Sequence, residues 1–523
     1  MTLSLSTVLA PILSKHDDKV LRGDYSGEVT IRYFFDLIYV MSPFSECRRL
    51  PFLACVLAVL LAPAFVVGQA YKEDVGYNKL RNEVGAGLAN GTGVNVAMVE
   101  ANVGGAGTNT YFPITSDPEF GGKTFIDVSS LVPRNNSGHA TSVAQLFFGN
   151  TSSMASGVSN IQVYDAANFV FNQQHRSQFG INPNATPPVS VMNHSYIGNG
   201  FTAAEARDSN ARLDYTVARD KFTSVVALNN GGALPQIYGQ SYNSIVVGLS
   251  NGGHSQGVTD VGVVGRVKPD IVSPRGTTSE ATPLISSAAA LLNQAANNFG
   301  SANARNSEVM KAIIMAGATK DTFPAWTNSS TRPLDSVFGA GQLNVYNSYK
   351  ILEAGETNGV INIPITNTAI NSGLRGWDYG TSITPGAPQF WNFNVTSGQT
   401  ISEASILLTW NAQYKNSNGD FDSNLSLANM DLKLFNSNNG VLGTEIGASI
   451  SLVDNVEHIY LKNLSAGLYT IAVNSNLNTS FGLAWNITAV PEPSSIACLC
   501  FVGMIASARA LKSRRRSRNR KND

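Results

Sequence analysis

The chain has 523 residues, enough for two or three domains beside any targeting segments. Hydrophobic residues make up 43% and charged residues 14%, and Gly, Asn, Ser and Thr are plentiful, a composition that suits a folded protein with many turns and argues against a disordered chain. The formal net charge is zero, but eight basic residues lie between Arg509 and Lys521, so the body of the chain is mildly acidic, which argues against nucleic acid as a partner.

All four cysteines lie towards the two ends of the chain, at Cys47, Cys55, Cys498 and Cys500. The body between them has none, so it can contain neither a disulfide framework nor a thiolate metal site. We therefore expect the body to be stabilised by packing and by any ions that it binds.

An export signal is predicted near the N-terminus. Two arginines at 48–49 precede an apolar run over 50–62, and the run closes on Gly68-Gln69-Ala70. A positive flank, an apolar stretch and small residues two apart are typical of a secretory signal peptide, which we place at 41–70 with cleavage after Ala70. The same run would also suit an N-terminal membrane anchor. Residues 1–40 are interpreted as a non-native extension upstream of a start at Met41.

The body from 71 to 356 alternates short β-type runs with Ala-rich helical runs. Strands alternating with helices predict a parallel sheet covered by helices on both faces, that is, an α/β fold. The buried strands are predicted at 94–99, 189–192, 224–228 and 244–249, and the helices at 141–148 and 283–298.

Three motifs place a carboxylate, a ring nitrogen and a hydroxyl at the ends of these elements. GTGVNVAMVE ends on Glu100 after a buried strand, GHATSVA places His139 at a helix start, and GTTSEATP does the same for Ser279. A serine hydroxyl is a poor nucleophile at neutral pH until a base removes its proton. An imidazole can take that proton and return it to a leaving amine. A carboxylate behind the ring fixes its tautomer and stabilises the imidazolium.

In this order the motifs resemble those of subtilisin-like serine peptidases. The segments 265–274 and 338–344 also resemble the approach to the nucleophile motif and the closing Gly-x-Gly-x-Val-Asn of that family. The resemblance covers nearly all of 87–350. It implies a subtilisin-like, mostly parallel sheet flanked by helices and a serine endopeptidase that acts on polypeptide substrates.

The resemblance also implies roles for particular residues. Ser279 corresponds to the nucleophile, His139 to the general base, and Glu100 stands where the family has an Asp. Asn230 corresponds to the side-chain donor of the oxyanion hole. The strand whose backbone pairs with an extended substrate corresponds to Ser195, Tyr196 and Ile197.

The sequence departs from the family pattern at several positions. Glu100 is one methylene longer than Asp, so its backbone must sit further back to reach the ring. Asp127 is a weaker stand-in for the acid. Replacements beside the other motifs, which alter the expected substrate pocket, are Thr277, Leu284 and Asn229.

Past residue 374 the helical runs vanish, and short alternating strands are separated by Asn, Gly and Ser turns. This pattern predicts a smaller all-β sandwich over 375–489, joined by a linker at 357–374. Asn418-Gly419-Asp420-Phe421-Asp422 offers oxygen ligands for a structural calcium ion, or forms a plain turn; no other metal or cofactor is predicted. The strands are predicted at 390–395, 404–410, 431–435, 458–461 and 467–473.

The last segment, 490–523, combines VPEPSS, an apolar stretch at 496–508 and an Arg-rich tail. Basic residues after a short apolar helix would hold the tail on the cytoplasmic side of a membrane. The segment resembles the PEP-CTERM sorting signal of certain Gram-negative bacteria, which an exosortase-type sorting enzyme reads. The resemblance implies export through the inner membrane to the cell surface, the outer membrane or the extracellular matrix. An ordinary tail anchor is the alternative.

Two other functions stay open from the sequence alone. One is a catalytically inactive protein that keeps the subtilisin-like fold and binds peptides, which the Glu at position 100 and Thr277 favour. The other is a cell-surface matrix protein whose function lies in the β-rich region.

Overall fold

The computed structural model describes residues 70–492, apart from 105–106, 178–179, 362–371, 418–419 and 439–440. Residues 41–69 of the predicted signal peptide and 493–523 of the predicted sorting segment lie outside the described residues. In the described part of the chain, no helix combines the length and the apolar character that a membrane crossing needs. All described residues fall in one compact unit, Val67–Asp523.

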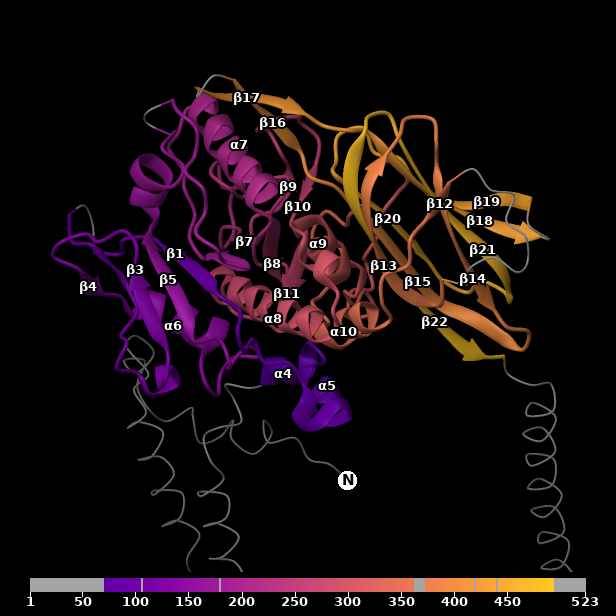
Figure 1. Ribbon diagram of the computed structural model, residues 1–523, viewed down its shortest axis with the longest axis horizontal. Helices are drawn as coiled ribbons and strands as arrows, with labels where there is room; N and C mark the ends of the chain where they lie inside the picture. Colours follow the sequence, from indigo (N-terminus) through magenta and orange to yellow (C-terminus); the bar gives the residue numbers. More distant parts are fainter. Residues whose placement is uncertain are drawn as a thin grey trace, which may run out of the picture. The chain divides into compact units, whose positions relative to one another are not determined.

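A parallel sheet forms the centre of the first region, as the alternation of strands and helices predicts (Figure 1). In the described residues seven strands pair in parallel throughout. The α/β fold class is therefore confirmed. In spatial order the strands are β11 (Ile271–Ser273), β8 (Ile245–Leu249), β7 (Thr223–Ala227), β6 (Val191–His194), β1 (Val96–Glu100), β5 (Asn160–Asp165) and β3 (Thr124–Asp127).

Helices cover both faces of this sheet (Figure 1). Val96 and Met98 face one buried cluster, which includes side chains of α6 (Gly138–Phe148), α8 (Thr278–Asn298) and α9 (Ser307–Ala316). Ala97 and Val99, one residue out of phase, face the other cluster, which includes α7 (Ala203–Asp220). Alternation along each strand thus sends apolar side chains to both faces.

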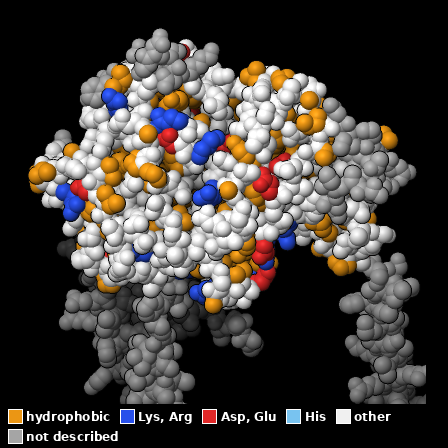
Figure 2. All heavy atoms as spheres, in the orientation of Figure 1, with side chains coloured by type: hydrophobic (Ala, Val, Ile, Leu, Met, Phe, Trp, Pro, Cys, Tyr) orange, Lys and Arg blue, Asp and Glu red, His pale blue; other side chains and the backbone are white. Residues whose placement is uncertain are grey.

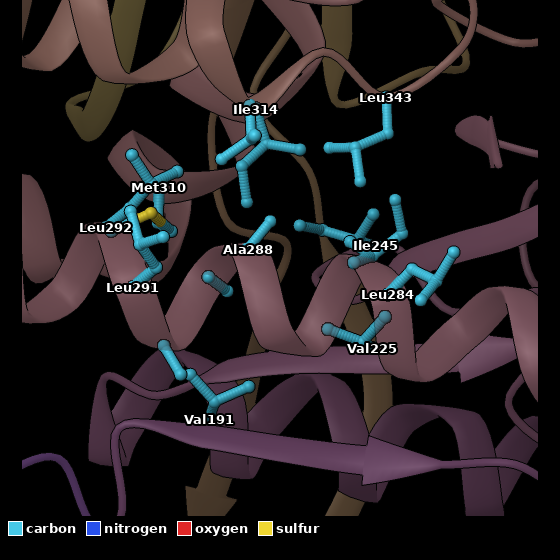
Figure 3. Packing of buried hydrophobic residues seen from close by; sticks show 14 of the residues in the cluster. Val191, Val225, Ile245, Leu284, Ala288, Leu291, Leu292, Met310, Ile314 and Leu343 are labelled. Carbon is cyan, nitrogen blue, oxygen red and sulfur yellow. The ribbon is translucent and has the colours of Figure 1, made fainter. Parts of the chain in front are cut away.

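The packing against α8 is dense. Figure 3 shows Val191 and Val225 from the sheet beside Leu284 and Ala288 from the helix. All four side chains are at most 1% exposed. Complete burial of a Val or Leu side chain contributes about 1.5–3 kcal/mol, so this face fixes the position of α8 and of the residues at its start.

The remaining elements of the α/β region are short. Two-residue and three-residue strands pair as β2 with β4 and as β9 with β10. Their bounds, with those of the other helices, are β2 Thr110–Phe112, β4 Asn135–Asn136, β9 Gly257–Val258, β10 Val267–Lys268, α4 Ala70–Asp74, α5 Tyr77–Val84, η2 Gly85–Gly87, η3 Pro118–Phe120, η4 Asn168–Gln173, η6 Ala302–Arg305 and α10 Val345–Glu353.

Two antiparallel sheets enclose a second apolar core, as the alternating pattern predicts. A separate hairpin, β16–β17, packs beside α7. The five-stranded sheet has the order β12 (Val360–Ile361), β14 (Gln389–Val395), β21 (Gly467–Ser475), β18 (Met430–Asn438) and β19 (Val441–Ser449). The four-stranded sheet has the order β13 (Arg375–Ile383), β22 (Thr479–Pro491), β15 (Gln399–Thr409) and β20 (Val456–Leu461), and the hairpin is β16 (Gln413–Ser417) with β17 (Asp420–Ser426).

The two regions share a core. Trp377, Leu407 and Ala484 from the β region belong to the same buried cluster as the sheet and helices of the α/β region. Polar contacts reinforce this packing: Trp377 Nε1 donates to the Leu352 carbonyl at 3.2 Å, and Lys320 Nζ to Ser405 Oγ at 3.1 Å. The boundary at 357–374 stays a prediction, since most of that segment lies outside the described residues.

The surface seen in Figure 2 carries few charges, and its basic and acidic side chains are intermingled. Such a mixed surface creates no extended field of one sign on this face.

Candidate active site

The fold brings Glu100 and His139 together from positions 39 residues apart. Glu100 is the last residue of β1, at the carboxyl end of a central strand, and it is completely buried. His139 is the second residue of α6, a helix whose start is fixed by Ser137, because its hydroxyl accepts a hydrogen bond from the Ala140 N–H at 3.1 Å. Glu100 Oε2 lies 2.9 Å from His139 Nδ1.

The pair combines a hidden carboxylate with an accessible ring, since the His139 side chain is 37% exposed. Burial raises the pKa of Glu100, and the hydrogen bond from His139 opposes that shift. The hydrogen bond to Glu100 raises the pKa of His139 against the smaller opposing effect of burial. The carboxylate therefore favours the protonated ring, which is the state that a general base reaches when it accepts a proton.

Ser279 occupies the first turn of α8, where backbone N–H groups have no partner within the helix. Thr277, the residue before the helix, makes no capping bond through its side chain. Asn230, three residues beyond β7, takes that place: its Oδ1 accepts from the Thr278 N–H at 2.8 Å and from Thr278 Oγ1 at 3.0 Å. These two bonds hold the Asn230 side chain close to the start of α8, and they use only its oxygen, so its amide nitrogen can donate a hydrogen bond to another group.

Ser195 and Ser279 contact each other twice. Ser279 Oγ donates to the Ser195 carbonyl oxygen at 3.3 Å, and Ser195 Oγ donates to the Ser279 carbonyl oxygen at 3.1 Å. Among the described residues, Ser279 Oγ makes no hydrogen bond to His139. The segment 195–197 follows β6 directly, so the predicted substrate strand runs past the predicted nucleophile.

The alternative acid lies elsewhere. Asp127 Oδ1 accepts from the Tyr111 hydroxyl at 2.6 Å and from the Ser130 N–H at 3.0 Å. His139 Nδ1 contacts Glu100 instead. Of the two carboxylates considered from the sequence, Glu100 is the one positioned to orient the ring.

Two of the residues that depart from the family pattern, Leu284 and Asn229, lie in different environments. Leu284 is completely buried in the core beneath the sheet. The Asn229 N–H donates to Ser255 Oγ at 3.1 Å, which anchors the loop that carries Asn230.

One polar residue near the site was missed by sequence reasoning. Asn193 is completely buried in β6; its amide nitrogen donates to Ser195 Oγ at 2.9 Å, and its oxygen accepts from Ser286 Oγ at 2.9 Å. It therefore ties the segment at 195 to the helix that carries Ser279. The available signal was an amide directly after the apolar run 191–192 of a buried strand, where a polar group must find partners.

Metal binding finds no support in the described residues, where no cluster of three or more His, Cys, Asp or Glu side chains is placed to hold an ion. The predicted calcium segment is only partly described, since Asn418 and Gly419 lie outside the described residues. Its last residue, Asp422, accepts from the Asn424 N–H at 2.9 Å, a local contact within β17.

No protein-family model and no curated protein matches the chain. Among solved structures, the serine protease of Aeromonas sobria, determined with its chaperone, is 12% identical over 77% of this chain and 88% of that chain, with a TM-score of 0.36. A cold-adapted subtilisin-like serine proteinase is 18% identical over 49% and 88%, with a TM-score of 0.33. The epidermin leader peptide processing serine protease of Staphylococcus aureus is 12% identical over 56% and 82%, with a TM-score of 0.38. These structural neighbours are serine proteases.

Proposed function

We propose that the chain is an exported subtilisin-like serine endopeptidase that hydrolyses peptide bonds through an acyl-enzyme on Ser279. The observation that carries the proposal is the 2.9 Å contact between the buried Glu100 carboxylate and Nδ1 of the accessible His139 ring. That contact leaves Nε2 of the ring as the atom available to take a proton. A buried carboxylate, an exposed imidazole and a serine at a helix start are the parts that such chemistry needs.

In the proposed reaction, His139 Nε2 removes the proton from Ser279 Oγ while the oxygen attacks the substrate carbonyl carbon. Glu100 holds the ring in the tautomer with the proton on Nδ1 and stabilises the imidazolium that forms. The imidazolium then returns its proton to the leaving amine, and the C–N bond breaks. Water, activated by the same ring, hydrolyses the ester and releases the free serine.

The start of α8 supplies the proposed oxyanion site. The Ser279 N–H lies in the first helical turn, and the Asn230 amide nitrogen is held beside it through the bond between Asn230 Oδ1 and the Thr278 N–H. Two fixed donors at a helix start suit the negative oxygen of a tetrahedral intermediate. The removal of one such donor typically costs about 2.7–4 kcal/mol of transition-state stabilisation.

Substrate binding would prepare the nucleophile. An extended peptide that pairs with residues 195–197 would direct a backbone N–H to the Ser195 carbonyl oxygen. That oxygen accepts the Ser279 hydroxyl in the free protein. The incoming N–H would take over this acceptor, and the released hydroxyl could turn to His139. The contact between Ser279 and Ser195 is also what favours the alternative, an inactive peptide-binding protein.

A fluorophosphonate probe separates these two functions, because it reacts only with an activated serine. We expect the wild-type protein to be labelled on Ser279 and to cleave a denatured protein. Ser279→Ala should abolish both signals. A wild-type protein that is neither labelled nor able to cleave any denatured protein would leave peptide binding without catalysis as the function.

Export and surface attachment belong to the same proposal and rest on the sequence at 41–70 and 490–523. The protein collected outside the cell should begin at or near Tyr71, after signal-peptide cleavage, and should lack the basic tail 509–521. N-terminal sequencing and mass spectrometry of the exported protein measure both ends. A mature protein that begins at Met1 or Met41 would contradict the signal-peptide interpretation.

A further inference from the structure

A bound peptide would place the side chain next to the attacked carbonyl, the P1 side chain, between two segments of the chain. Under the proposed function the carbonyl carbon lies against Ser279 Oγ and its oxygen faces Asn230. Ser279 Oγ is 3.3 Å from the Ser195 carbonyl oxygen, so the P1 residue lies opposite Ser195. Because Asn230 is bonded to Thr278 on the other side of Ser279, a side chain at this position would enter between the segments that follow Ser195 and Asn230, 195–198 and 230–237.

These two segments meet at Gly198 and Ile237. The Ile237 N–H donates to the Gly198 carbonyl at 3.1 Å, within an isolated antiparallel bridge. The Ile237 side chain lies 3.1 Å from the point where a Cβ on Gly198 would stand, and the Phe201 ring lies 3.3 Å from it. Ile237 is only 4% exposed and belongs to a buried cluster against which Tyr196 and Phe201 pack. The space between the segments is therefore filled by a branched side chain.

The residues on either side hold Ile237 in place. Gln236 Oε1 accepts from the Phe201 N–H at 2.8 Å, and Gln236 Nε2 donates to the Phe201 carbonyl at 2.9 Å. Tyr238 has a φ of 64°, a left-handed conformation that is uncommon outside glycine, and its hydroxyl lies 2.6 Å from Nδ1 of the buried His175. With both neighbours fixed, Ile237 cannot move aside without disturbing packed backbone.

We infer that Ile237 closes the floor of the P1 pocket and restricts cleavage to bonds that follow small residues such as Gly, Ala or Ser. The inference rests on the proposed function and adds to it the substrate class. In a close-packed pocket, each added methylene changes kcat/KM by roughly 10–200-fold, so a phenylalanine side chain at P1 should be strongly disfavoured.

The test uses two fluorogenic peptides that differ only at P1, one with Ala and one with Phe. We expect wild-type kcat/KM to favour Ala by at least about tenfold. Ile237→Ala should move the ratio towards Phe by at least about tenfold, because it removes the closing atoms. Ile314→Ala is the matched control: Ile314 is completely buried in the other cluster, so its loss should lower the melting temperature and leave the ratio unchanged.

Two results would overturn the inference: a wild-type protein that cleaves the Phe peptide as well as the Ala peptide, or an unchanged ratio in folded Ile237→Ala. If Ile237→Ala does not fold, Ile237→Val removes one methyl group and should shift the ratio in the same direction by a smaller factor. Failure of the proposed function looks different. In that case the wild-type protein cleaves neither peptide and is not labelled by a fluorophosphonate, and the inference is lost with it.

Discussion

Each region of the molecule contains a completely buried glutamate, Glu100 in the α/β region and Glu457 in the β region. Burial raises the pKa of both, to about 9 in the case of Glu457. Their partners differ. Glu457 Oε1 accepts from the Ser451 N–H at 2.6 Å, and Glu457 Oε2 accepts from the Ser449 hydroxyl, so its partners are uncharged and buried. Glu100 has one oxygen on an accessible imidazole and one, Oε1, without a hydrogen-bond partner among the described residues.

Burial and a raised pKa therefore do not by themselves identify a functional acid. What distinguishes Glu100 is a titratable partner that reaches solvent, and a position at the carboxyl end of a central parallel strand. Glu457 lies within an antiparallel strand, and its hydrogen bonds satisfy it locally, so we interpret it as structural. Changes at the two sites should therefore affect different properties of the protein.

The largest effect is expected when the groups that react are removed. Ser279→Ala and His139→Ala should each lower kcat by about 10⁴–10⁶-fold, and the double variant should be scarcely worse, because members of a triad act as a unit. Neither change should lower the melting temperature markedly, since both side chains lie at the accessible edge of the site. Steady-state kinetics and thermal unfolding on the same preparations measure the two properties. Losses that multiply in the double variant would contradict a shared mechanism.

Glu100→Gln should lower kcat by about 10⁴-fold, because the amide keeps the shape but cannot stabilise the imidazolium. It should also move the pH profile. Catalysis needs neutral His139, and the bond to Glu100 raises the pKa of His139, so activity in the wild type should rise at a higher pH than an unperturbed histidine would give. Without the negative charge the pKa of His139 falls, and the acid limb of kcat/KM should shift to lower pH.

Glu100→Asp tests whether the site depends on the length of the glutamate side chain. If the backbone is adjusted to Glu, the shorter side chain falls short of Nδ1 and activity drops. Activity that holds or rises in Glu100→Asp would show that the 2.9 Å contact does not depend on the extra methylene. Glu457→Gln is the matched control and should leave kcat/KM unchanged.

Glu457→Gln should instead change how stability depends on pH. The folded-state pKa of Glu457, about 9, lies above the ordinary value of about 4.3, so between these values the folded protein holds a proton that the unfolded chain releases. The wild type should therefore lose about 1.4 kcal/mol of this contribution per pH unit as pH rises through that window. The glutamine variant has no carboxyl group to titrate. Its free energy of unfolding should therefore rise relative to that of the wild type as pH increases. Denaturant unfolding at pH 5, 6, 7 and 8 measures it, and a constant difference would contradict the assignment.

The sequence was enough to predict the arrangement at the ends of the strands. Alternation of apolar strands and Ala-rich helices predicts a parallel sheet, and a carboxylate directly after one strand then lies at the edge where active sites of such sheets form. The pairing of Glu100 with His139 was expected from the resemblance of their two motifs to those of subtilisin-like peptidases, and alternation alone would not predict it. The contacts of Ile237 with Gly198 and of Ser195 with Ser279 could not be predicted, because they depend on how loops far apart in sequence settle against each other. Local pattern carries no information about that register.

The shared core of the two regions could not be predicted from the sequence either. A substitution in this core should have the smallest effect of those predicted. Gly482, in β22, lies so close to α9 that a Cβ there would stand 2.5 Å from the Glu308 carbonyl oxygen and 2.6 Å from Val309 Cα. These are backbone atoms, which cannot rotate away, so Gly482→Ala should lower the free energy of unfolding by about 1–3 kcal/mol.

Gly87→Ala is the control for Gly482→Ala, since nothing lies within 4 Å of the added methyl group and stability should be nearly unchanged. Because Trp377, Leu407 and Ala484 share a cluster with the α/β core, Gly482→Ala should shift one common unfolding transition, with activity and β-region fluorescence lost together. Below that transition kcat/KM should equal the wild-type value, because α9 does not contribute to the proposed site. If the β region unfolds first while Ser279 still reacts with a fluorophosphonate, the two regions are separate folding units and the shared cluster does not couple them.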